Sequence, residues 1–121
     1  ERGHGGKIVN VASQMGLVGD RERVVYCATK AAVVNITRVL AIEWAPHGIN
    51  VNAIAPTYVR TPLVEALIQD KAVHEDIIRR IPLGRMAEPD DIAPSVIFLA
   101  SAASDFVTGH TLAVDGGWTA V

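Results

Sequence analysis

Three residues, Ser13, Tyr26 and Lys30, place a hydroxyl, a phenol and an ammonium at a spacing that suits proton transfer. Tyr26 follows Ser13 by thirteen positions, and Lys30 follows Tyr26 by four. Residues four apart on a helix lie one turn apart and project from the same face. A neighbouring ammonium stabilises a phenolate and lowers the pKa of the phenol, which can then exchange a proton near neutral pH. With a serine hydroxyl to hold the reacting oxygen, the pattern indicates chemistry at a carbonyl or an alcohol.

The elements that must position these residues alternate between strands and helices. Short β-branched and apolar runs predict strands, and apolar periodicity closed by Pro, Gly or Asp predicts helices. The alternation is typical of an α/β fold in which helices cover a parallel sheet. Ligands of such sheets bind at the carboxyl ends of the strands, where Ser13 would lie. The expected strands are 7–12, 49–55 and 111–114, and the expected helices are 24–45, 63–72, 73–81 and 89–102.

The helix expected over 24–45 is apolar on nearly every side, so it needs cover from two directions. A sheet on one side and a partner subunit on the other would supply that cover. A sheet of about three strands also leaves a bare hydrophobic edge. We therefore expect further strands, from additional sequence or from a neighbouring chain.

Composition narrows the class of protein. The 121 residues suffice for one domain, and the formal net charge is -2 with no basic block, which argues against nucleic acid or an anionic membrane as partner. The single cysteine, Cys27, excludes an internal disulfide and favours a reducing, cytoplasmic setting. No apolar run reaches membrane-spanning length, and the first six residues contain no apolar signal core. We expect no membrane partner.

Other chemistries fit less well. The four histidines, at positions 4, 47, 74 and 110, have no metal-ligand spacing. Ser13 lacks the Gly-x-Ser-x-Gly context of a hydrolase nucleophile. A serine that ends a strand is often only a cap, and a Tyr–Lys pair occurs by chance on many helices. The combination of the three residues, at a strand end and the next helix start, is what carries the interpretation.

Whole segments of the chain resemble the C-terminal half of the short-chain dehydrogenases/reductases. The resemblance covers essentially all 121 residues and implies a Rossmann-like, doubly wound parallel sheet of which residues 1–121 form the catalytic half. It rests on the strand that ends in Ser13, on the Tyr-x-x-x-Lys sequence, and on three further segments: Gly48–Pro56, Pro82–Arg85 and Asp115–Gly117.

The resemblance implies a role for each member of the triad. Tyr26 would be the acid/base, Lys30 would assist it and hydrogen-bond the nicotinamide ribose, and Ser13 would orient the substrate carbonyl. The cofactor would be NAD or NADP. Hydride would pass between nicotinamide and substrate carbon while the protein handles the proton.

The same resemblance extends to the surrounding loops. Pro56, Val59 and Thr61 would contact the nicotinamide end of the cofactor. Residues 57–81 would form a substrate lid. Gln14, Met15 and Tyr58, with residues near Leu63, would line the substrate pocket, although simple loop packing explains them equally well.

Three departures from the family pattern are evident. The family's catalytic asparagine and its glycine-rich phosphate loop are not in these residues, so the choice between NAD and NADP is open. Thr57 follows Pro56 where glycine is commonest, which resembles sugar- and polyol-type members. The expected substrate is a small sugar or polyol, or a 3-oxoacyl-type molecule.

Two functions are therefore open. The chain is either the catalytic half of an oxidoreductase or a truncated, non-catalytic fragment that persists as an oligomer. Both predict a homo-oligomer, a dimer or tetramer, assembled through helix 24–45 and the C-terminal strand.

Overall fold

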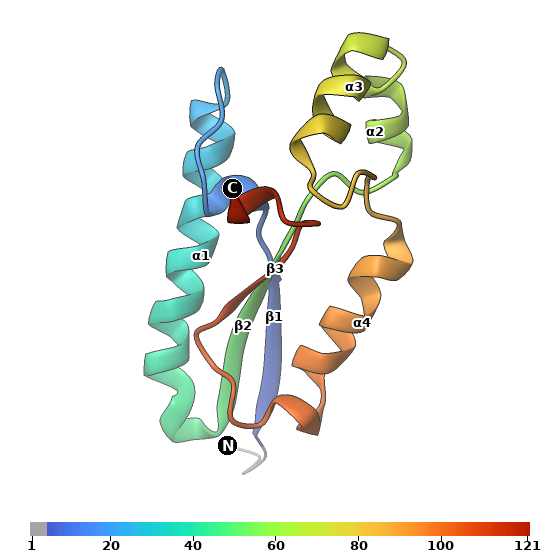
Figure 1. Ribbon diagram of the computed structural model, residues 1–121. Coiled ribbons are helices and arrows are strands. Elements are labelled where there is room, and N and C mark those ends of the chain that lie inside the picture. Colours follow the sequence, from blue (N-terminus) through green and yellow to red (C-terminus); the bar gives the residue numbers. More distant parts are fainter. Residues whose placement is uncertain (1–4) are drawn as a thin grey trace.

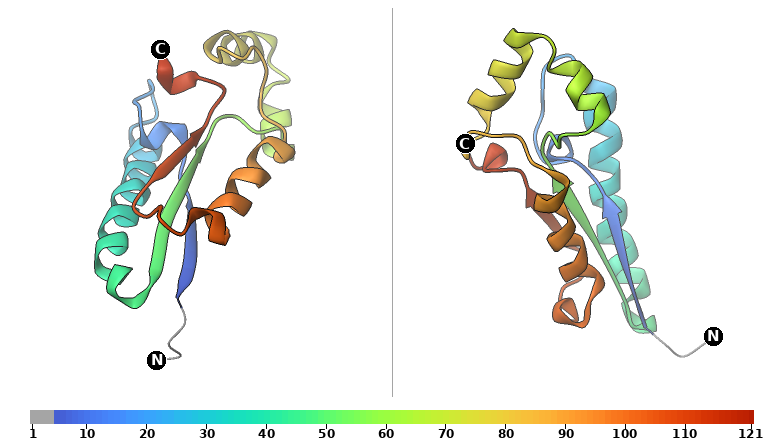
Figure 2. Two further views of the ribbon diagram at one scale, coloured as in Figure 1. Left: turned by 60° about the horizontal axis from the view of Figure 1, so that its bottom comes forward. Right: turned by 90° about the vertical axis from the view of Figure 1, so that its right-hand side faces the viewer.

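The computed structural model describes residues 5–121 and contains one parallel three-stranded sheet with helices on both faces (Figures 1 and 2). The strands are β1 (Gly6–Val11), β2 (Ile49–Pro56) and β3 (Thr111–Val114). Their order is β1-β2-β3, so β2 is central. The predicted α/β class is confirmed, and each strand lies within one residue of its expected range.

The two long helices lie on opposite faces of this sheet (Figure 2). Helix α1 (Val24–Trp44) packs mainly on β2, and α4 (Pro89–Ala100) covers the other face. The start of α4 is fixed by Pro89 and by a capping box. In this box the Glu88 side chain accepts from the backbone N–H of Asp91, and the Asp91 side chain accepts from the backbone N–H of Glu88. The alternation of strand and helix thus builds a three-layer unit.

Two short helices, α2 (Pro62–Leu67) and α3 (Lys71–Arg80), stand beyond the carboxyl end of β2 (Figure 1). The prediction that the first of them runs to residue 72 is wrong. The Asp70 carboxylate accepts from the backbone N–H groups of Ala72 and Val73, so it caps a new helix and separates the two. Residues 62–80 therefore form two short helices, as expected, but the break between them lies earlier than predicted.

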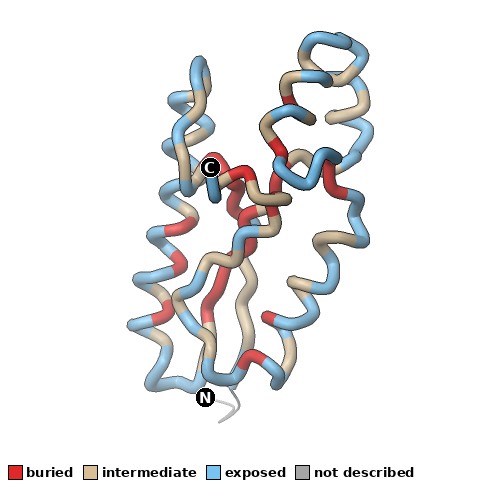
Figure 3. The backbone as a smooth tube through the Cα atoms, viewed as in Figure 1, coloured by how far each residue is buried: buried red, intermediate tan, exposed pale blue. Residues whose placement is uncertain are grey.

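The deepest part of the core follows β2, where Val51, Ala53 and Ala55 are fully buried (Figure 3). A second apolar cluster lies at the carboxyl ends of the strands and contains Met15, Ile77, Ile81, Met86 and Trp118. This cluster joins helix α3 to the turn after β1 and to the C-terminal segment. Helix α3 is consequently packed against the segments that carry the predicted site.

Helix α1 corrects one expectation from the sequence. By length and composition alone, Val24–His47 is long and apolar enough to cross a membrane, contrary to the expectation that no apolar run reaches that length. One face of the helix packs on the sheet, where Val34, Thr37 and Ala41 are buried. A single helix of this kind is weak evidence for a membrane span. The predicted cover by a sheet is confirmed for this face, whereas apolar side chains such as Val24 and Ile42 on the remainder are exposed.

Candidate functional site

Ser13 lies directly beyond β1 and is 7% exposed. It caps the one-turn 3-10 helix η1 (Gln14–Gly16), because its Oγ accepts from the Met15 backbone N–H at 3.1 Å. Ser13 therefore does act as a helix cap. A hydroxyl that accepts one hydrogen bond still has its own proton to donate, so capping and substrate binding are compatible.

Tyr26 and Lys30 lie in the first two turns of α1 and face the same side of the helix. The Lys30 Nζ lies 5.9 Å from the centroid of the Tyr26 ring and donates to the Val11 carbonyl oxygen at 3.4 Å. Gly16 packs against the backbone at Lys30 so closely that a Cβ atom built there would lie 2.7 Å from the Lys30 carbonyl oxygen. The end of β1, η1 and α1 are thereby held together.

A cavity of about 430 Å³, here called the inner cavity, opens at the carboxyl end of the sheet. Ser13 and Tyr26 both line it. So do the other predicted residues Gln14, Met15, Tyr58, Val59 and Thr61. Lys30 and Pro56 lie outside its wall, Pro56 as the last residue of β2. The structure thus gathers most of the predicted site residues around one space.

The inner cavity also contains residues that the sequence did not single out as site residues. These are Arg23, Thr57, and Val64 and Leu67 of α2. Leu63 also lines the cavity, as expected for the residues near it. Two buried polar atoms in its wall, Gln14 Oε1 and Thr57 Oγ1, have no hydrogen-bond partner among the described residues. Unpaired buried polar atoms are costly, so these two groups are unusual within the described residues.

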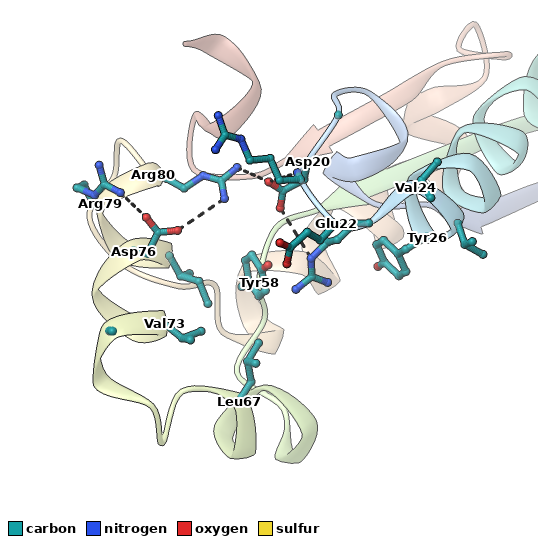
Figure 4. A pocket seen from close by; sticks show the side chains of 16 residues that line it. Asp20, Glu22, Val24, Tyr26, Tyr58, Leu67, Val73, Asp76, Arg79 and Arg80 are labelled. Atoms are coloured by element: carbon teal, nitrogen blue, oxygen red, sulfur yellow. Dashed lines mark hydrogen bonds and ion pairs between the residues drawn. The ribbon is translucent and has the colours of Figure 1, made fainter.

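A larger cavity of about 1480 Å³, the outer cavity, adjoins the inner one (Figure 4). The two share Arg23, Tyr26, Tyr58 and Leu67. Across this space the Asp20 Oδ1 accepts from Arg80 Nη2 of α3 at 3.0 Å. The guanidinium of Arg80 also lies over the Trp118 ring, 4.1 Å from its centroid. The loop that precedes α1 is therefore tied to helix α3 by the Asp20–Arg80 pair.

Tyr58 stands between the two cavities, with its ring 5.9 Å from that of Trp118. Burial raises the pKa of the Tyr58 phenol, and the positive charge of Arg23 opposes part of that rise. The phenol consequently stays protonated at neutral pH and can donate a hydrogen bond.

The loop after β2 is fastened by backbone contacts to the segment before α4. Tyr58 O accepts from Ala87 N at 3.0 Å, and Ala87 O accepts from Arg60 N at 2.8 Å. Thr61 caps α2, since its Oγ1 accepts from Val64 N at 3.3 Å. These bonds present residues 57–61 to the inner cavity in a fixed conformation.

Within residues 5–121, no group of three or more His, Cys, Asp or Glu side chains is placed to hold a metal ion. His4 lies outside the described residues. Cys27 is partly buried and packs against the apolar cluster around Met15. The arrangement at the inner cavity is instead one of hydroxyl, phenol and amide groups.

Comparison with known proteins agrees with this geometry. The family model described as enoyl-(acyl carrier protein) reductase matches residues 1–119. The chain is 51% identical to a 2-dehydro-3-deoxy-D-gluconate 5-dehydrogenase of Dickeya dadantii (strain 3937), covering 99% of this chain and 47% of that protein. It is 48% identical to an NAD-dependent glycerol dehydrogenase of Listeria innocua, covering 95% of this chain and 45% of that protein.

A solved structure shows the same fold. The crystal structure of a gluconate 5-dehydrogenase from Burkholderia cenocepacia J2315, in complex with NADP and tartrate, superposes with a TM-score of 0.94 at 44% identity. The alignment covers 99% of this chain and 47% of that one. The chain thus spans about half the length of the curated relatives it matches. On these matches, the chain belongs to the short-chain dehydrogenase/reductase family.

Proposed function

We propose that the protein is an NAD(P)-dependent oxidoreductase that interconverts an alcohol and a ketone or aldehyde on a sugar or polyol. The observation that carries this proposal is that the Ser13 hydroxyl and the Tyr26 phenol line the same cavity. Lys30, one helical turn from Tyr26, stands beside the phenol ring.

The proposed proton chemistry uses these three residues. In the direction of reduction, the Tyr26 hydroxyl donates a proton to the substrate oxygen as that oxygen becomes an alcohol. The Ser13 hydroxyl, whose lone pair is engaged by Met15 N–H, donates a hydrogen bond to the same oxygen and stabilises its developing negative charge. The Lys30 ammonium stabilises the phenolate that remains. In the direction of oxidation each proton moves the opposite way.

The nicotinamide cofactor supplies or accepts the hydride when it is bound. Residues of this chain fit its nicotinamide end. Thr57 offers a buried hydroxyl without a partner among the described residues, and Val59 and Thr61 continue the same fastened loop. Lys30 would reach the adjoining ribose. No glycine-rich loop for the phosphates occurs in residues 5–121, so these residues fit one end of the cofactor only.

We favour a sugar or polyol over a 3-oxoacyl chain as the substrate. The relatives named above are called gluconate-type and glycerol dehydrogenases. We infer the same class of substrate here, and a cytoplasmic location in keeping with the single unpaired thiol of Cys27.

We also propose a homo-oligomer, a dimer or tetramer. The outer face of α1 exposes Val24, Val25, Ile36 and Ile42, which is unusual for a helix in contact with water alone. A second copy of the chain, packed on this face and along the C-terminal strand, would cover it. Light scattering on the purified protein tests this, and a monomer at micromolar concentration would contradict it.

The alternative function is a truncated fragment that oligomerises without turnover. Intact mass separates the two, because a species near 12.9 kDa favours the fragment and one of roughly twice that mass favours the enzyme. We expect the 121-residue chain by itself to bind NAD(H) or NADP(H) negligibly, since it offers no phosphate loop. Tight binding by calorimetry would contradict that expectation.

The proposed activity is tested by measuring reduction of NAD and NADP by the full-length gene product with a panel of sugars, sugar acids and polyols. Turnover of at least one of these compounds is expected. No turnover of any of them, in a folded protein that binds the cofactor, would contradict the proposal.

A further inference from the structure

Arg23 is the one charged residue in the wall of the inner cavity, among the described residues that line it. Among the described residues no carboxylate lines that wall. A guanidinium in a cavity of small-molecule size favours an anionic guest, because Asp20, its partner at 3.8 Å, is shared with Arg80 and only partly neutralises it.

The guanidinium of Arg23 is only loosely engaged. Its Nε lies 3.8 Å from Asp20 Oδ2, beyond hydrogen-bond range, and Asp20 is held more closely by Arg80. Arg23 is the N-cap residue of α1 but makes no side-chain cap bond. The described residues therefore leave most of the N–H donors of the Arg23 guanidinium available to a ligand.

The backbone just before Arg23 is strained. Glu22 has a φ of 60, which is uncommon for a residue other than glycine. The left-handed turn at Glu22 sends the chain directly into α1 and sets Arg23 at the rim shared by the two cavities. Strained non-glycine residues of this kind cluster at functional sites.

We propose that Arg23 binds the carboxylate of a polyhydroxy acid, so that the enzyme prefers sugar acids to neutral polyols. This inference rests on the proposed dehydrogenase function and names its substrate class. Arg23 is then a specificity-determining residue, separate from the proton-transfer groups.

A carboxylate fits better than a phosphate ester. One guanidinium can pair with both oxygens of a carboxylate through two parallel N–H donors. A phosphate ester carries more charge and three acceptor oxygens, for which this wall offers no second cation. Arg23 also draws down the pKa of Tyr58 against the effect of burial, so its field does reach the cavity wall.

The test compares D-gluconate with D-glucitol, which carries a CH₂OH group in place of the carboxylate, and with D-glucitol 6-phosphate. The quantity measured is the ratio of kcat/KM for D-gluconate to that for D-glucitol, on the full-length gene product, its Arg23→Gln and Arg23→Lys variants, and an Arg21→Gln control. Arg21 is exposed and lies outside the inner cavity, so its variant removes the same charge two residues away. A ratio taken on one preparation is independent of the fraction that is folded.

We expect the parent ratio to exceed one, and Arg23→Gln to lower it about 10- to 100-fold through a higher KM for D-gluconate, because a charged hydrogen-bonded pair is lost. Arg23→Lys should fall between parent and Arg23→Gln, and Arg21→Gln should match the parent. An unchanged ratio in Arg23→Gln, or equal turnover of the acid and the polyol by the parent, would overturn this inference alone. Preference for the phosphate would overturn the carboxylate assignment. Absence of turnover with every alcohol would contradict the proposed function on which the inference rests.

Discussion

Ser13 and Tyr26, thirteen positions apart in the sequence, open into one cavity at the carboxyl end of the sheet. Ser13 is brought there by the end of β1 and Tyr26 by the first turn of α1. Lys30 completes the group from the next turn and is tied back to β1 through the Val11 carbonyl oxygen. The relationship depends on close packing between η1 and α1, and the first prediction concerns that packing.

Replacing Gly16 by alanine should reduce turnover although all three proton-transfer residues remain. The added Cβ would lie 2.7 Å from the Lys30 carbonyl oxygen, and its nearest neighbours are backbone atoms that cannot rotate away. Overpacking of this kind costs about 1–3 kcal/mol of stability and would displace α1 from η1. Steady-state kinetics and thermal unfolding measure the two effects. The control is Gly19→Ala, where a Cβ meets nothing within 4 Å, and equal behaviour of the two variants would argue against the packing explanation.

Removal of the Arg80 side chain should weaken the packing of helix α3 against the loop before α1 and the C-terminal segment. Arg80 pairs with Asp20 at 3.0 Å and covers the Trp118 ring, so Arg80→Ala loses both contacts. We expect the free energy of unfolding to fall by about 1–2 kcal/mol and KM for the substrate to rise more than kcat falls. Urea titration and kinetics check this.

The neighbouring Arg79 provides a matched control, since its side chain is 77% exposed and contacts only Asp76 of its own helix. Arg79→Ala should change stability by less than about 0.5 kcal/mol. If both variants had the same stability and KM, the contacts of Arg80 with Asp20 and Trp118 would have no energetic role.

Asp115 should make stability depend on pH below neutrality. Burial alone would raise the pKa of this carboxyl, but hydrogen bonds from Thr119 and Gly117 outweigh burial and hold the pKa below its ordinary value. A carboxyl whose folded pKa is depressed stabilises the fold above its unfolded pKa of about 3.9, and that contribution is lost as the pH falls through the folded pKa.

The Asp115→Asn variant should therefore be less stable than the parent by about 1–3 kcal/mol near pH 7, with the difference shrinking as the pH falls below about 4. Urea titrations at several pH values between neutrality and the acid range measure it. A difference that stays constant over that range would show that the ionised carboxylate is not the stabilising form.

Much of the fold could be predicted because the strands and α1 are marked by local signals. The β-branched run that ends at Ser13 and the apolar segment closed by Pro46 and Gly48 each identify one element without tertiary information. The end of α2 could not be located in this way. In the sequence, Asp70 cannot be told apart from an aspartate that simply faces water. Only the hydrogen bonds that it accepts from the backbone N–H groups of Ala72 and Val73 identify it as a cap.

Most residues around the candidate site could be identified from the sequence, but not all of them. Ser13, Tyr26 and Lys30 stand out because their types and spacing imply a proton-transfer group. Arg23 carried no comparable signal, since it sits in a loop of alternating charges that resembles any exposed turn. Its place in the wall of the cavity depends on the turn at Glu22 and on how the lid packs, which are tertiary features.

The central claim, that Tyr26 is the proton donor and acceptor, is tested most directly by Tyr26→Phe in the full-length gene product. The phenol in the same cavity, Tyr58, provides the comparison through Tyr58→Phe. We predict that Tyr26→Phe lowers kcat about 100- to 10,000-fold and leaves the Kd for NAD(P)H, measured by fluorescence titration, within about threefold, whereas Tyr58→Phe keeps most of its turnover. A Tyr26→Phe enzyme that retains the parent rate would contradict the account.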